Sequence, residues 1–168
     1  MVEIDSTQVR DALRRHEAAG CHVDHRLCRE VEQPGQMFLV AVQTPDEFLR
    51  LVWQSISDAQ PLVPVDSPRT LRDCASRLRS FGWQFRTLVE RGFPWFEKCV
   101  IIDESFDYSK LGWIAVTPLI DGEKRDSPDG TYYVYDGVHK SIVLAKKLLR
   151  NELEFKPVEL LLLTPRRN

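Results

Sequence analysis

Tyr132-Tyr133-Val134-Tyr135-Asp136-Gly137-Val138-His139-Lys140-Ser141-Ile142-Val143-Leu144-Ala145 is the stretch that decides the fold. The segment from Thr131, just before this stretch, to Tyr135 is rich in β-branched and aromatic residues, which predicts a strand. From Val138 to Arg150 the apolar residues recur at helical spacing, which predicts an amphipathic helix. Pro157 to Leu163 predicts a further strand, so the C-terminal unit is strand, Asp-Gly turn, helix, strand.

The pattern outside this unit predicts helices in the first half of the chain and strands mainly in the second half. Helices are expected at Ser6 to Ala19, Pro45 to Ser57, Pro68 to Gly82 and Trp83 to Glu90. Strands are expected at Met37 to Val42, Gln60 to Val65, Cys99 to Ile102 and Trp113 to Ile120, and a hairpin loop at Asp121 to Gly130. We therefore expect an α/β domain with a small mixed sheet, built largely from the second half, and helices packed around it.

Several helix ends carry recognisable capping residues. Ser6 or Thr7 is expected to cap the first helix, with Gly20 after its end. Thr44-Pro45-Asp46-Glu47 has the pattern of a capping box with proline at the first helical position. Asp66-Ser67-Pro68 is expected to cap the helix that ends near Gly82.

The composition is that of an ordinary globular protein, with 168 residues, 43% hydrophobic and 29% charged residues, and a net charge of −2. This predicts one domain, with a helix-rich N-terminal extension at 1–59 and a core at 60–168. The charge offers no overall attraction to nucleic acid or to an anionic membrane. No apolar run is long enough to span a bilayer, and four cysteines without a secretory signal are expected to stay reduced, so we expect a cytoplasmic protein.

The Asp-Gly turn has the features of an anion site. A helix that begins directly after a strand exposes unpaired amide groups and the positive end of the helix dipole. Gly137 allows a tight turn, and the side chains of His139, Lys140 and Ser141 add donor groups to the backbone amides from Gly137 through Val138 to Lys140. Lysine at a helix N-terminus opposes the dipole, and such local misfits occur at functional sites.

These residues resemble the ParB/sulfiredoxin-like superfamily. The strand, the Asp136-Gly137-Val138-His139-Lys140 variant of a Gly-x-His-Arg turn, the helix with Ala145 and the strand after Phe155-Lys156-Pro157 match its pattern. The match covers residues 113 to 163 well and extends weakly over 60 to 82. Lys140 departs from the usual arginine and replaces bidentate phosphate recognition with a point charge.

The resemblance implies a nucleotide-binding protein. Members of the superfamily include CTP-binding partition proteins, ATP- or ADP-dependent kinases, nucleases and a reductase of peroxiredoxin sulfinic acid. The reductase branch is disfavoured because Val138 stands where its reactive cysteine lies, and the partition branch because no helix-turn-helix region follows. We expect ATP or another nucleotide as ligand, with Mg²⁺, and phosphotransfer or nucleotide hydrolysis at the turn.

Catalysis would also need a base that accepts the proton of the attacking hydroxyl. His139 lies in the turn itself, while Asp136 caps the helix, orients His139 or helps to hold a metal ion. Asp103 and Glu104, expected at the end of a strand, and Asp66 are the other candidates. The phosphate acceptor, a small molecule or a nucleic acid, and the oligomeric state stay open.

Two other functions remain as alternatives. A metal-dependent nuclease on the same turn would need a basic groove, for which the sequence offers Arg69, Arg72, Arg79, Lys146 and Lys147. A noncatalytic module that binds nucleotide or nucleic acid is the other, and the change from arginine to lysine at position 140 favours it.

Two further clusters have a structural and a functional interpretation. Cys21, His25 and Cys28 have the spacing of one helix face, but three ligands on one helix converge poorly on zinc, so no metal site is predicted there. An aromatic stretch can stack single-stranded nucleic acid or, as we expect, pack the helices onto the sheet. Its members are Phe81, Trp83, Phe85, Phe93, Trp95 and Phe96, interleaved with Arg79, Arg86 and Arg91.

Overall fold

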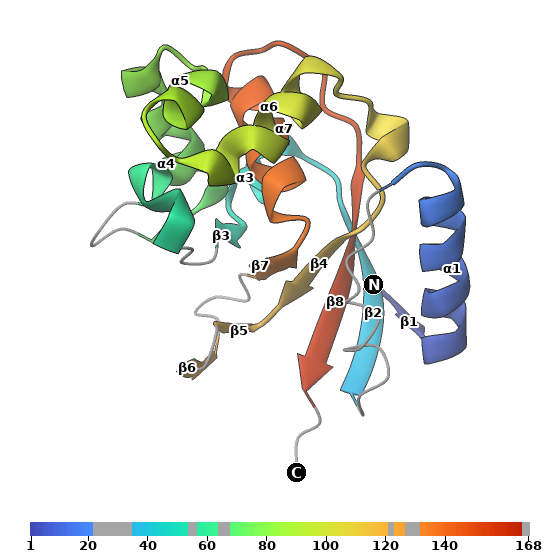
Figure 1. Cartoon of the computed structure of the whole chain (residues 1–168). Helices are drawn as coiled ribbons and strands as arrows, with labels where there is room; N and C mark the ends of the chain where they lie inside the picture. The colour runs from blue at the N-terminus through green and yellow to red at the C-terminus, as the bar shows by residue number, and fades with distance from the viewer. Residues whose placement is uncertain (22–34, 54–56, 64–67, 121–122, 127–131, 166–168) are drawn as a thin grey trace.

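A six-stranded mixed sheet, in the order β1-β2-β8-β4-β7-β3, organises the chain (Figure 1). The computed structural model describes residues 1–21, 35–53, 57–63, 68–120, 123–126 and 132–165. The strands are β1 (Val2–Ile4), β2 (Gly35–Val42), β3 (Val52–Trp53), β4 (Ile114–Thr117), β7 (Tyr133–Asp136) and β8 (Val158–Pro165). Neighbours are antiparallel, except that β4 runs parallel to β8 and β3 parallel to β7. The predicted α/β class is confirmed.

Different helices cover the two faces of the sheet (Figure 1). Successive strand residues point to opposite faces, so Ile114 joins the main core with α3 to α7, whereas Ala115 joins a smaller core with Leu13 of α1. The helices are α1 (Ser6–Ala18), α3 (Pro45–Leu49), α4 (Leu71–Ser76), α5 (Phe85–Glu90), α6 (Glu97–Glu104) and α7 (Val138–Leu149). Short 3₁₀ helices are η1 (Ser57–Leu62), η2 (Arg77–Phe81), η3 (Pro94–Phe96) and η4 (Tyr108–Lys110).

The strand–turn–helix–strand unit at the C-terminal end is confirmed. β7 ends at Asp136, Gly137 is the N-cap residue, and α7 begins at Val138. The apolar stripe of this helix is buried against the sheet and against α4 and α6, and β8 follows as the returning strand. Periodicity and a single glycine were sufficient to predict this unit.

The N-terminal part of the chain contributes more to the sheet than its sequence indicated. β1, β2 and β3 all precede residue 60, and β2 pairs with β8 along its whole length. The helix expected from Pro45 to Ser57 ends at Leu49, because Val52 and Trp53 pair with β7 as a buried strand. Each half of the chain supplies three of the six strands, so the second half contributes a smaller share of the sheet than expected.

Two predicted strands are wrong. The run Cys99 to Ile102 lies in α6, where Cys99 is buried and Ile101 is 64% exposed. A short apolar run cannot separate strand from helix, and here Pro94 starts η3, which continues directly into α6. Gln60 to Leu62 belongs to η1, where Pro61 has no amide hydrogen to give to a sheet. Pro64 and Val65, which complete the second predicted strand, lie outside the described residues.

The helix caps are residues of the predicted kinds, but not all of them lie at the predicted positions. Thr44 and Glu47 form the expected capping box, while Asp5, rather than Ser6 or Thr7, caps α1. Thr70 caps α4, and the expected cap at Asp66-Ser67 lies outside the described residues. The helix predicted from Pro68 to Gly82 is present as α4 followed by η2.

The polar insert is a hairpin in its described part. β5 (Leu119–Ile120) and β6 (Glu123–Asp126) pair antiparallel outside the main sheet. The turn residues Pro128, Asp129 and Gly130 lie outside the described residues. In the ranges that the structure describes, no helix is long and apolar enough to cross a membrane.

Candidate phosphate-binding turn

Gly137 makes the sharp change from β7 into α7 possible. Its φ of +79° lies in the left-handed region, and an added Cβ would meet Lys140 Cε at 2.5 Å and Ile114 Cγ1 at 3.4 Å. Glycine therefore serves both the backbone conformation and the close packing. As an N-cap residue without a side chain, Gly137 cannot cap the first amide groups of α7 itself. The positive end of the α7 dipole lies directly after the C-terminal end of β7, a strand that pairs with β4 on one side and β3 on the other.

Lys140 does not extend away from the turn. Its Nζ donates to the backbone oxygens of Leu111 and Trp113, each at 2.6 Å. Burial lowers the pKa of Lys140, and the negative charge of Asp136 opposes this effect. Lys140 therefore ties the first turn of α7 to the segment that leads into β4, and its ammonium group is occupied by these bonds.

Ser141 and Val138 also take part in internal bonds. The Ser141 hydroxyl is fully buried and donates to the Val138 carbonyl at 2.8 Å. The same carbonyl accepts a bond from Trp53 Nε1 at 3.3 Å. In this arrangement Ser141 stabilises the turn, and the amide groups of the first helical turn are the donors suited to an anion.

His139 lies against an aromatic cluster. Its ring stacks on Trp95 with centroids 4.0 Å apart and an interplanar angle of 21°, and both residues are half-buried. Trp95 in turn meets the buried Trp53 edge-on at 5.6 Å. The imidazole is thus held beside the start of α7, with part of its surface exposed.

Asp136 is the candidate carboxylate that the structure places at the turn. It is half-buried at the end of β7, and its charge acts on Lys140. A single carboxylate can help to hold Mg²⁺ together with phosphate oxygens and water, so the turn fits the implied ion only in that limited way. Within the described part of the chain, no three His, Cys, Asp or Glu side chains gather as a metal site.

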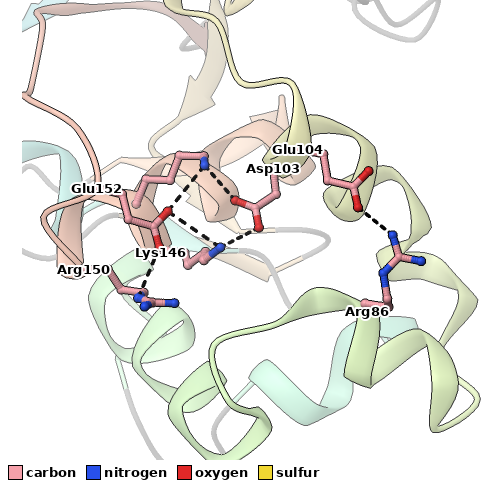
Figure 2. A network of polar contacts seen from close by, with 7 residues as sticks. Arg86, Asp103, Glu104, Lys146, Arg150 and Glu152 are labelled. Carbon is pink, nitrogen blue, oxygen red and sulfur yellow. Dashed lines mark hydrogen bonds and ion pairs between the residues drawn. The ribbon is translucent and has the colours of Figure 1, made fainter.

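Asp103 lies far from the turn, in an ion network near the other end of α7 (Figure 2). Its carboxylate contacts Lys146 Nζ at 2.5 Å and Lys147 Nζ at 3.0 Å. Glu152 joins the network through Lys146, Lys147 and Arg150. Because helical residues rise about 1.5 Å each, Lys146 is about 10 Å along the axis from His139.

Glu104 is also separate from the turn. It forms an exposed ion pair with Arg86, at 2.6 Å (Figure 2). Both Asp103 and Glu104 were expected at the end of a strand, and both lie at the end of α6 instead. The structure therefore does not bring these two carboxylates to His139.

Some of the remaining candidates lie among the described residues and others lie outside them. Asp66, His25 and Cys28 lie outside the described residues. Cys21 is buried as a free thiol, with Sγ 3.9 Å from the Ser109 oxygen, and Cys74 and Cys99 are also buried and free. Burial raises the pKa of Cys74 to about 12, which makes that thiol inert as a nucleophile.

Sequence reasoning missed the aromatic neighbours of the turn. Trp53 and Trp95 lie far from His139 in the chain, so only the folded chain reveals the stack. The prediction that the aromatic stretch packs the helices onto the sheet is confirmed, because Phe85 and Phe96 lie in the main core. Phe81, Trp83, Phe93 and Trp95 pack against that core from partly exposed positions.

The fold and the turn together define an α/β domain in which a helix begins at a glycine N-cap directly after a strand of the mixed sheet. No family model, curated protein or solved structure matches the chain. The likeness to ParB/sulfiredoxin-like proteins therefore rests on the residues of the turn and on the elements around it.

Proposed function

We propose that this chain is a nucleotide-binding protein whose phosphate site is the first turn of α7. The observation that carries the proposal is Gly137, which turns β7 into α7 in a left-handed conformation and leaves the helix start without a capping side chain. Amide groups and the helix dipole favour an anion at such a position. The ParB/sulfiredoxin-like pattern of the turn supports a nucleotide as the source of the phosphate.

His139 is the side chain best suited to contact the ligand. Its stack on Trp95 fixes the ring plane, so the imidazole can donate to a phosphate without losing much side-chain freedom. Lys140 contributes indirectly, by fixing the position of the turn through the carbonyls of Leu111 and Trp113. The sequence alone predicted a site in which the side chains of both His139 and Lys140 hold the phosphate; in this proposal, of these two side chains only His139 contacts it.

Binding without phosphotransfer is the form of the proposal that the contacts favour. A transferase needs a base near the acceptor hydroxyl, and Asp103 and Glu104 are engaged elsewhere, with Lys146 and Arg86. Among the candidate carboxylates that the structure describes, Asp136 is the one at the turn, beside Lys140. Phosphotransfer or hydrolysis with ATP or another nucleotide and Mg²⁺ therefore depends on Asp136 and His139.

A nuclease is the less favoured alternative. Its basic groove would draw on Arg72, Lys146 and Lys147, but Arg72 pairs with Asp46 at 2.7 Å and both lysines pair with Asp103. These pairs reduce the positive charge available to a nucleic-acid backbone at that place. As part of the same proposal we assign the protein to the cytoplasm, with which the free thiols of Cys74 and Cys99 agree.

The test is a panel of ATP, ADP, CTP and GTP with Mg²⁺, in which melting temperature, binding heat and phosphate release are measured. One nucleotide should raise the melting temperature of the wild type, and His139→Ala should abolish the rise. His139→Phe keeps a ring against Trp95 and separates the loss of the imidazole from the loss of the stack. Arg14→Ala, on the exposed side of α1, is the matched control and should bind as the wild type does. Absence of binding heat with all four nucleotides would overturn the proposal.

A further inference from the structure

A cationic and aromatic surface lies near the end of α7 opposite to the glycine turn. We call it the Trp83 surface, and it consists of Arg79, Phe81, Trp83, Arg91 and Arg150. The guanidinium carbons of Arg79 and Arg150 each lie 5.9 Å from the centroid of the Trp83 ring. Arg91 lies 5.1 Å from the Phe81 ring centroid. Two half-buried rings are thus bordered by three cations from separate elements.

The charge of this surface is only partly compensated. Arg150 pairs with Glu152 at 3.2 Å. Arg79 and Arg91 are exposed, and among the residues that the structure describes neither forms an ion pair. The whole chain carries a net charge of −2, so the surface is a local concentration of positive charge on a slightly acidic protein.

The backbone at Trp83 is unusual as well. Trp83 has a φ of +62° directly after Gly82 at +63°, and its amide donates to the Leu78 oxygen at 2.8 Å. The left-handed conformation is unfavourable for a residue with a side chain. This turn places the Trp83 ring near both Arg79 and Arg150, with part of the ring packed against the main core and part of it exposed.

We propose that the Trp83 surface binds single-stranded nucleic acid. Exposed ring faces and guanidinium planes stack on unpaired bases, while arginines also contact the phosphates between them. The Trp83 surface offers groups for both kinds of contact. Trp83 and Phe81 would stack on bases, and the nucleic-acid phosphates would be bound by Arg79, Arg91 and Arg150. Binding of this kind tolerates many sequences and needs no groove that would admit a duplex.

This surface is separate from the candidate phosphate site. Arg150 follows α7, and Gly137 precedes it, so about 18 Å of helix lies between them. The nucleic-acid proposal therefore does not rest on nucleotide binding at the turn. Variants at Trp83 and at His139 test the two proposals independently.

The experiment measures fluorescence anisotropy of a labelled oligo-deoxythymidine of about 15 nucleotides, at about 50 mM salt, against a duplex of the same length. We expect the single strand to bind more tightly than the duplex. Trp83→Leu should weaken binding by about tenfold, because one stacked base is lost, whereas Trp83→Phe should retain most of it. The double variant Arg79→Ala with Arg91→Ala should weaken binding and make the salt slope shallower by about 1.4. The double variant Arg10→Ala with Arg14→Ala, at two exposed positions of α1, removes the same charge and is the control.

Three outcomes would overturn the proposal. The first is no binding of the single strand at low salt. The second is equal binding of strand and duplex with Trp83→Leu unaffected, since stacking would then play no part. The third is full competition by an acidic peptide together with indifference to Trp83→Leu, which would make the surface a site for an acidic protein partner. Melting curves of each variant exclude loss of folding as the cause.

Discussion

The two ends of α7 hold lysines in opposite ways. At the C-terminal end, Lys146 and Lys147 lie beside Asp103 and Glu152, and cations there also agree with the helix dipole. At the N-terminal end, Lys140 opposes the dipole and is held by two backbone carbonyls. The first arrangement pairs its lysines with carboxylates at the helix end where the dipole favours positive charge. The second keeps a positive region beside a helix start that already carries positive potential.

This difference indicates where the chain has room for a ligand. In the network around Asp103, Lys146 is paired with the carboxylates of Asp103 and Glu152. An anion that bound this lysine would have to displace a carboxylate (Figure 2). Around Gly137, Asp136 is the one candidate carboxylate within the described ranges whose charge opposes the helix dipole and Lys140. The N-terminal end is therefore the better anion site, although the C-terminal end contains more lysines.

The largest effect is expected from Asp103→Ala. Removing this carboxylate leaves Lys146, whose side chain is only 7% exposed, without its closest counter-charge. We expect the free energy of unfolding to fall by about 3 kcal/mol, the usual cost of breaking a buried pair, and the melting temperature by about 6–12 °C. Glu104→Ala breaks the exposed pair with Arg86 and should cost less than about 1 kcal/mol. Equal losses in both variants would contradict the assignment of Asp103 to a buried network.

Lys140→Met tests the corresponding role at the N-terminal end. The variant keeps most of the side-chain volume but leaves the carbonyls of Leu111 and Trp113 without this donor and removes the cation on which the Asp136 charge acts. We expect a loss of about 2 kcal/mol in chemical unfolding. If stability were unchanged while nucleotide binding disappeared, Lys140 would be a ligand-contacting residue rather than a positioning residue.

Gly137→Ala is expected to have a smaller effect on the same turn. The left-handed conformation costs alanine about 1 kcal/mol, and its Cβ would push against Lys140 Cε, at the end of a flexible side chain. The measurement is chemical unfolding, with Gly20→Ala as the control. Gly20 also has a positive φ, of +84°, but has open space around the added Cβ. A larger loss at Gly20 than at Gly137 would show that close packing at the turn is unimportant.

The sequence was sufficient for elements whose signals are local. The α7 stripe, the Gly137 turn and the Thr44 capping box follow from residues within a few positions of each other. The strand predicted at Cys99 to Ile102 failed because its apolar run is too short for its period to decide, and packing against α7 favours a helix. β3 was missed because its two residues become a strand only through pairing with β7.

The site was predictable as a location but not as a set of contacts. The direction of Lys140 depends on carbonyls 27 and 29 residues earlier in the chain. The pairing of Asp103 with Lys146 spans 43 residues, and the stack of His139 on Trp95 depends on the same tertiary packing. A motif can therefore indicate the turn, whereas the fold decides which of its side chains face a ligand.

The smallest effect is a pH dependence at His16, which connects α1 to the region of Lys140. Burial lowers the pKa of His16, the charges of Lys140 and Arg15 lower it further, and Glu159 opposes them. The unfolded chain therefore binds more protons than the folded one just below the ordinary value of 6.5. Stability should fall as the pH drops from that value through the folded pKa, and stay flat above it. Because His16 is partly solvated, we expect less than about 1 kcal/mol.

His16→Gln should remove this slope in chemical unfolding measured across the acidic range. In Lys140→Met the pKa of His16, followed by NMR titration, should rise toward 6.5, because one of the two cations that lower it is gone. An unchanged pKa in that variant would mean that Lys140 lies too far from His16 to act on it. The charge of Lys140 at the N-terminal end of α7 would then have no effect on the α1 side of the sheet. Burial and the charge of Arg15 would remain as the causes of the lowered pKa of His16.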